Sequence, residues 1–103
     1  MKRIIVHYGM PDDPAAFDAH YEKTHIPLTS AMPHLKSFEI SRGDVSCSDE
    51  ARPVYLTAIL SYESAADMEA SLASEEGKTA VADVANFATG GVTLVTIDTE
   101  ELL

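Results

Sequence analysis

The chain has 103 residues, of which 46% are hydrophobic, 17 are acidic and seven are basic. This length fits a single domain spanning residues 1–103. The net charge of −10 argues against nucleic acid or an anionic membrane surface as a partner, because such a surface repels phosphate groups. No apolar run approaches the roughly 20 residues that cross a bilayer. The one cysteine, Cys47, cannot close an internal disulfide, so a cytoplasmic location is expected.

A helix is predicted to begin after Asp13 and to end before Pro27. Asp13 is a suitable N-cap because its carboxylate accepts free backbone N–H groups, and Pro14 fits the first helical position, where no N–H is needed. A residue that precedes proline is pushed away from helical backbone angles, so Ile26 should end the helix at about residue 24 or 25. The expected elements of this half are a strand over 2–8, this helix from residue 14, a short helical piece over 28–32 and a strand over 35–42.

The second half of the chain predicts a strand, two helical pieces and a final strand. Ser64 and Asp67 have the spacing of a capping box, in which side chains satisfy free backbone N–H groups at a helix start. Gly77 suits the left-handed conformation that closes a helix, and Gly90–Gly91 breaks the next one. The expected elements are a strand over 54–62, a helix over 65–74, a helical piece over 79–88 and a strand over 92–97.

The order strand, helix, strand, strand, helix, strand predicts an α+β fold of the ferredoxin-like type, βαββαβ. Right-handed crossovers then give a four-stranded antiparallel sheet in the order 4-1-3-2, with the helices on one face. The sheet's other face is expected to carry Ile5, His7, Tyr55, Thr57 and Ile59, a set too apolar to face water. We therefore expect a second copy to cover it in a homodimer, a dimeric α/β barrel with a cavity.

The stretch from His20 to Leu28 holds the strongest candidates for a reaction centre. Tyr21 and His25 are four residues apart, so on a helix they point into one space. Free carbonyl groups at a helix C-terminus favour a cation, so the pKa of His25 should rise toward neutrality and suit proton transfer. Tyr21 is suited to donate a hydrogen bond to an oxygen that gains charge. The alternative is structural, with both side chains simply finishing the helix and satisfying loop carbonyls.

The same stretch does not predict a metal site. His20 and Thr24 form a second pair with the same spacing, next to the first. His20 and His25 are five residues apart, which on a regular helix separates their directions by roughly 140°. A shared metal ion is therefore not expected. Neither a glycine-rich dinucleotide fingerprint nor a phosphate loop occurs, so no bound cofactor is expected either.

Three stretches of the chain carry a family pattern, namely residues 8–17, residues 20–28 continuing to residue 35, and residues 74–77 with 86–88. Through them the chain resembles the EthD family, small ferredoxin-like proteins of the dimeric α/β-barrel superfamily. The resemblance implies a dimer built by sheet-to-sheet packing. It places the family element on His20, Tyr21, Thr24, His25 and Pro27. One departure is His34, where the family usually has glycine; histidine takes positive φ less readily, so the turn into the second strand is expected to differ.

The resemblance also bears on activity, since members of that family are often labelled reductases without a defined reaction. Relatives across the superfamily include cofactor-free monooxygenases. We expect a small enzyme, of oxidoreductase type or using cofactor-independent proton transfer, that acts on a small hydrophobic or aromatic molecule. His25 is its expected acid or base and Tyr21 is expected to hold an oxygen. The expected substrate-binding residues are His20, Thr24, His7, Tyr55 and Phe87. The alternatives are a non-catalytic module that binds a hydrophobic ligand for a partner oxidase, and a purely structural dimer.

Overall fold

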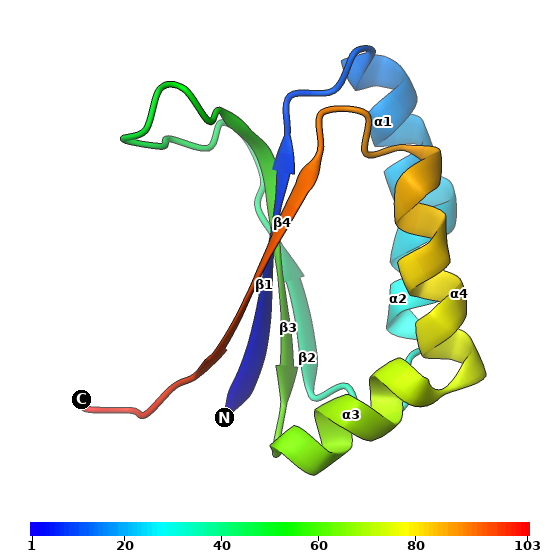
Figure 1. Cartoon of the computed structure of the whole chain (residues 1–103), viewed down its shortest axis with the longest axis vertical. Helices are drawn as coiled ribbons and strands as arrows, with labels where there is room; N and C mark the ends of the chain where they lie inside the picture. The colour runs from blue at the N-terminus through cyan, green and yellow to red at the C-terminus, as the bar shows by residue number, and fades with distance from the viewer.

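A computed structural model describes all 103 residues as one antiparallel sheet with helices on one face (Figure 1). The strand order is β2-β3-β1-β4, which confirms the predicted ferredoxin-like topology. The two central strands, β1 and β3, pair along their whole length, while β2 and β4 form the edges. The strands are β1 (Lys2–Gly9), β2 (Ser37–Ile40), β3 (Val54–Tyr62) and β4 (Val92–Asp98).

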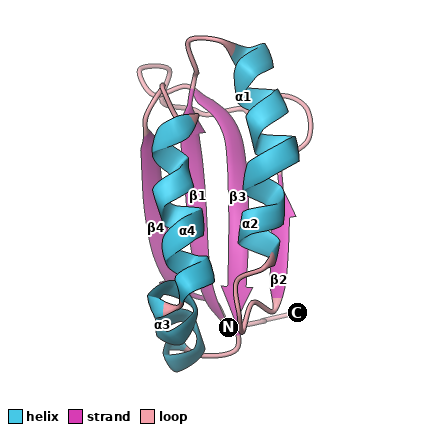
Figure 2. Cartoon of the chain, turned by 90° about the vertical axis from the view of Figure 1, so that its right-hand side faces the viewer, coloured by secondary structure: helices cyan, strands magenta, loops and turns pink.

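The helices form two parallel rods across the sheet and a third piece at one end (Figure 2). The first rod is continuous and passes from α-helix to π-helix and back to α-helix. The second rod lies beside it, and the third helix joins that rod to β3. None of these helices is long and apolar enough to cross a membrane. The first rod comprises α1 (Pro14–His20), the π-helical η1 (Tyr21–His25) and α2 (Ile26–Ser30); the others are α3 (Ala65–Ala73), α4 (Glu75–Asp83) and the 3₁₀ turn η2 (Val84–Asn86).

The first rod does not end before Pro27, so the predicted helix end was wrong. The backbone N–H of Ile26 bonds to the carbonyl of Tyr21, five residues back, which makes this turn a π turn. Pro27 then sits in the first turn of α2, where its missing N–H costs nothing. In a regular α-helix the proline ring would press on the carbonyl of Lys23; the wider π turn opens that space. The predicted start was correct, since Asp13 accepts the N–H of Ala16 at 3.2 Å.

The junction between α3 and α4 also differs from its prediction. Ser64 caps α3 as expected, accepting the N–H of Asp67 at 3.1 Å. Ser74 ends α3 and also caps α4, accepting the N–H of Gly77 at 3.0 Å. Gly77 therefore lies inside α4 and does not close a helix. A Cβ there would lie 2.1 Å from the carbonyl oxygen of Ser71, so glycine is needed for the close approach of the two helices.

The sheet presents one buried and one open face. Ile4, Val6 and Tyr8 of β1 face the helices and are buried. The register shifts between Tyr8 and Gly9, which pair with Leu56 and Val54 respectively. This bulge leaves Tyr55 out of the ladder and turns it toward the helices.

Tyr55 is therefore not part of the open face, contrary to the prediction. Its hydroxyl donates to the carboxylate of Asp18 in α1 at 2.8 Å, and its ring packs on Phe17 of the same helix. The strict alternation of a flat strand placed Tyr55 beside Thr57, and the bulge breaks that alternation.

His34 adopts a left-handed backbone conformation, with φ of 65°, so the turn into β2 has the shape that glycine would favour. The expected difference at this turn does not occur. Left-handed backbone costs a residue with a Cβ about 1–2 kcal/mol, whereas glycine loses more freedom on folding. The strain is therefore carried by His34 itself.

We expect His34→Gly to raise the free energy of unfolding by about 0.5–1 kcal/mol, the backbone strain relieved less the extra entropy of glycine in the unfolded chain. Urea titration at neutral pH measures it. His34→Ala is the matched control, because it removes the loose 4.0 Å approach of His34 to Asp67 but keeps the strained φ. An alanine variant as stable as the glycine variant would contradict the assignment of strain to the backbone.

Candidate functional site

A cavity of about 430 Å³ lies between the sheet and the two helical rods. Sixteen of its 18 lining residues are hydrophobic, so it suits an apolar guest of small-molecule size. Val81 of α4 with Val92 and Leu94 of β4 line it and remain exposed, by 59%, 39% and 60%. These three residues mark an opening between α4 and the edge strand.

The polar groups of the cavity wall come from four side chains. They are Tyr8 of β1, Tyr21 and His25 of η1, and Thr29 of α2. All four are buried, with exposed fractions between 2% and 5%. The wall formed by β1 and the first rod is therefore the place where the cavity can exchange hydrogen bonds or protons with a guest.

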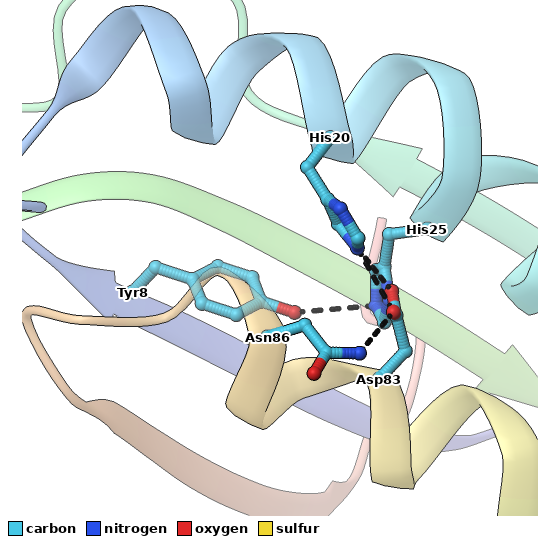
Figure 3. Close-up of polar contacts among 5 residues, drawn as sticks. All are labelled: Tyr8, His20, His25, Asp83 and Asn86. Carbon is cyan, nitrogen blue, oxygen red and sulfur yellow. Dashed lines mark hydrogen bonds and ion pairs between the residues drawn. The ribbon is translucent and has the colours of Figure 1, made fainter.

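Behind this wall, the buried carboxylate of Asp83 gathers three neighbours (Figure 3). His25 approaches it through Nδ1 at 3.0 Å, and His20 through Nε2 at 2.8 Å. Asn86 donates its side-chain amide to the same carboxylate at 3.0 Å. The two histidine contacts join α4 to the first rod, and the contact of Asn86 holds η2 against α4.

The convergence of His20 and His25 overturns the prediction that they point about 140° apart. That angle holds for a regular α-helix of 3.6 residues per turn. In the π turn each backbone hydrogen bond spans five residues, so side chains five apart come to lie above one another. Both histidines therefore reach Asp83 from one face of the rod.

Burial sets the charge state of this pair. Burial alone would raise the pKa of Asp83, but the hydrogen bonds from Asn86, His20 and His25 outweigh it and hold that pKa below its ordinary value. Burial lowers the pKa of His25 below 6.5, and the neighbouring Asp83 offsets only part of that effect. The predicted rise was wrong because His25 lies inside the rod and not at a helix end.

The hydrogen bonds of His25 also assign its tautomer. An ionised carboxylate only accepts, so Nδ1 of His25 carries the proton and donates it to Asp83. Nε2 is then unprotonated at neutral pH and can accept a hydrogen bond. It faces the hydroxyl of Tyr8 across 3.5 Å, on the cavity wall. The imidazole is thus oriented to take a proton from a guest.

The two phenols on the wall stay protonated near neutral pH. Burial raises the pKa of Tyr8 to about 12 and raises the pKa of Tyr21 as well. The ring of Tyr21 stacks on Phe17 with 5.6 Å between centroids, which fixes its direction. Both hydroxyls are therefore hydrogen-bond donors, and that of Tyr8 is directed at Nε2 of His25.

The remaining candidates from the sequence lie outside the cavity lining. His20 stacks on Phe87 behind the wall and is bound to Asp83. Thr24 is half-buried on the first rod. His7 lies on the open face of the sheet, where its Nδ1 is 2.9 Å from the hydroxyl of Thr57. Of the predicted residues, Tyr21 and His25 are the two that reach the cavity.

Sequence reasoning missed Asp83, Asn86 and Tyr8. For Asp83 a signal existed: it lies three residues after Ala80 and four before Phe87, on the apolar face of the predicted helix over 79–88. A carboxylate on such a face needs partners, since burying an unpaired charge is costly. No group of three or more His, Cys, Asp or Glu side chains is arranged to hold a metal ion.

More distant solved structures share the fold. A dimeric ferredoxin-like protein of unknown function from Thermobifida fusca matches with a TM-score of 0.69 at 13% identity, over 95% of this chain and 90% of that one. SnoaB, a cofactor-independent oxygenase from Streptomyces nogalater, also matches with a TM-score of 0.69, at 12% identity over 99% of this chain and 95% of its own.

Closer comparisons identify the family. An uncharacterized 11.0 kDa protein in the thcB-thcC intergenic region of Rhodococcus erythropolis is 44% identical over all of this chain and 99% of its own length. The crystal structure of an ethyl tert-butyl ether D (EthD) family protein from Bacillus halodurans superposes with a TM-score of 0.86 at 29% identity, covering 97% of this chain and 99% of that one. The model of the EthD domain matches residues 11–91. The chain therefore belongs to the EthD family.

Proposed function

We propose that this protein is an enzyme that moves a proton to or from a small hydrophobic molecule bound in the cavity, with His25 as its general acid or base. One observation carries the proposal: His25 lines an apolar cavity, and a buried carboxylate holds its Nδ1 and leaves its Nε2 unprotonated. A base fixed in this way keeps its geometry while it accepts a proton, and general acid–base catalysis contributes about 10²–10⁴-fold to rates.

Asp83 has the role of a positioning residue in this proposal. It fixes the tautomer of His25 and stabilises the imidazolium that forms when Nε2 takes a proton, the part that the aspartate plays in a Ser-His-Asp triad. His20 and Asn86 support Asp83 from the far side, away from the cavity. His20 therefore acts through Asp83 and makes no contact with substrate.

The cavity supports an uncharged substrate. Apart from the two phenols, His25 is the one titratable group in its lining, and its lowered pKa keeps it neutral at neutral pH. A charged guest would lose its hydration without gaining a countercharge. The fold likeness to SnoaB supports chemistry without a cofactor, and the oxidoreductase form of the proposal is oxidation of the deprotonated substrate by molecular oxygen, which accepts the electrons. The exposed single cysteine, Cys47, fits a cytoplasmic site of action.

A homodimer formed through the open face of the sheet is part of the proposal. Ile5, Ile59 and Val95 lie in one row across that face, paired strand to strand. Val95 is 40% exposed in the single chain. The loop between β2 and β3 and the C-terminal tail both extend on this side of the sheet, away from the helices (Figure 1). The likeness to the dimeric protein from Thermobifida fusca supports the same arrangement.

We expect Val95→Glu to convert a dimer into a monomer, because the row would bring two buried carboxylates together without partners. Sedimentation velocity at micromolar concentration measures the change. Leu94→Glu is the matched control, since it is the next residue of β4, faces the cavity side and is also exposed. A monomeric wild type, or a Val95→Glu dimer, would rule out this interface.

We expect His25→Gln to lose about 10²–10⁴-fold of the proton-transfer rate, the range typical of a general base. The assay follows deuterium uptake from D₂O into the α-positions of 2-tetralone, an apolar ketone, by NMR. His34→Gln is the matched control, because His34 is an exposed histidine that does not line the cavity. Exchange catalysed equally well by wild type and His25→Gln would refute the role of His25.

The same assay has a predicted pH dependence. Only neutral imidazole accepts a proton, and the pKa of His25 lies below 6.5, so the rate should hold at pH 6.5 and fall in more acidic solution. It should not decline on the alkaline side near neutrality, since the pKa of Tyr8 is about 12. A rate that falls as pH rises through neutrality would contradict a base of this kind.

A further inference from the structure

The hydroxyl of Tyr21 is the one buried side-chain polar atom to which the protein offers no hydrogen-bond partner. The residue is 2% exposed and lines the cavity. Leaving a buried hydroxyl unpaired is unfavourable, and phenylalanine would fill the same space without that penalty. A tyrosine at this position therefore needs a reason beyond packing.

Tyr62 shows how the same chain treats a phenol at equal depth. Its ring is fully buried, and its hydroxyl lies 3.0 Å from the hydroxyl of Ser71. Tyr62 is absent from the cavity lining. The unpaired hydroxyl thus belongs to a tyrosine that lines the cavity, and the paired one belongs to a tyrosine enclosed by protein.

Three polar atoms meet on the wall around Tyr21. The hydroxyls of Tyr8 and Tyr21 approach each other closely enough for a weak hydrogen-bond contact to shift both pKa values, but the geometry of that contact falls short of a full hydrogen bond and leaves the hydroxyl of Tyr21 unsatisfied. Tyr8 faces Nε2 of His25 across 3.5 Å, a long distance for such a contact. Hydrogen bonds in a site without its ligand are often long and tighten when the ligand arrives.

The aromatic cluster holds these groups in place. The ring of Tyr21 stands edge-on to Tyr8 at 5.7 Å and lies 5.2 Å from the ring of His25. Phe87 packs on all three, at centroid distances from 4.7 to 5.5 Å. The two donors and the acceptor therefore form a rigid polar spot, while Thr29 supplies the other polar side chain of an apolar lining.

We propose that the cavity binds an uncharged, mainly hydrocarbon ring compound with a single oxygen, a phenol or a cyclic ketone, and that Tyr21 donates a hydrogen bond to that oxygen. The inference deepens the proposed function and rests on it for the ligand to be a substrate. The polar cluster of Tyr8, Tyr21 and His25 on an apolar wall matches one oxygen on an apolar ligand, and a second polar group on the ligand would have only Thr29 as a partner. A carboxylate is disfavoured because no lysine or arginine lines the cavity.

The test compares 2-naphthol with naphthalene, which has the same rings and no oxygen. Both are titrated by their own fluorescence against wild type, Tyr21→Phe and Tyr62→Phe. Tyr21→Phe should weaken 2-naphthol binding roughly five- to tenfold, the loss of one hydrogen bond, and change naphthalene binding less than twofold. Tyr62→Phe is the matched control, with the same chemical change outside the cavity, and should leave both affinities unchanged.

Thermal unfolding of the free variants gives an independent readout. Tyr21→Phe should melt at or above the wild-type temperature, because no partner is lost. Tyr62→Phe should melt lower by about 4–8 °C, the shift expected for one lost buried hydrogen bond in a domain of this size. A purely structural role for Tyr21 would instead lower its melting temperature and weaken both probes equally.

The inference is overturned if wild type binds neither probe, or if Tyr21→Phe binds 2-naphthol as tightly as wild type does. It is supported if 2-naphthol alone is weakened in that variant.

Failure of the proposed function gives a different result. A protein that binds 2-naphthol through Tyr21 but catalyses no deuterium exchange is a binding module. If deuterium exchange occurs but Tyr21→Phe binds 2-naphthol as tightly as wild type does, the substrate oxygen is held by another residue.

Discussion

The buried carboxylate of Asp83 is the constraint on which the rest of the site depends. It lies at the end of α4 and receives His20 and His25 from the first rod, so it ties together the two rods that roof the cavity. A buried charge of this kind is tolerated only when its lone pairs are occupied. The same bonds that meet this requirement also orient His25, whose other ring nitrogen contacts the hydroxyl of Tyr8 on the cavity wall. The bonds that join the two rods are therefore the same bonds that orient the imidazole of His25.

This arrangement depends in turn on the π turn of η1. An α-helical turn would send one of the two histidines away from Asp83, leaving either an exposed imidazole or a carboxylate with fewer donors. The turn also makes room for Pro27, which would otherwise end the rod before α2 covered the sheet. The π turn thus allows the first rod to continue past Pro27 and also allows both of its histidines to reach Asp83. Such π turns often mark functional sites.

The fold could be predicted because its signals are local. Caps at Asp13 and Ser64, β-branched runs and the order of elements need no knowledge of distant contacts. Tyr21 and His25 were found by spacing alone, since they are four apart in either kind of helix. Asp83 could not be paired with His20 from the sequence, because that pairing needs both the π winding and the approach of α4. Tyr55 was misplaced for a similar reason, as a one-residue bulge reverses its direction.

The polar groups behind the cavity wall have their hydrogen-bond partners, whereas those on its cavity side are incompletely paired. Behind the wall, the carboxylate of Asp83 has hydrogen bonds to His20, His25 and Asn86, and these form without a ligand. In front of it, the hydroxyl of Tyr21 is unpaired and the contact between Tyr8 and His25 is long. Selection for stability alone would have favoured an apolar residue in place of Tyr21. The difference supports the proposal that a ligand completes the hydrogen bonding of a site whose scaffold is already in place in the free protein.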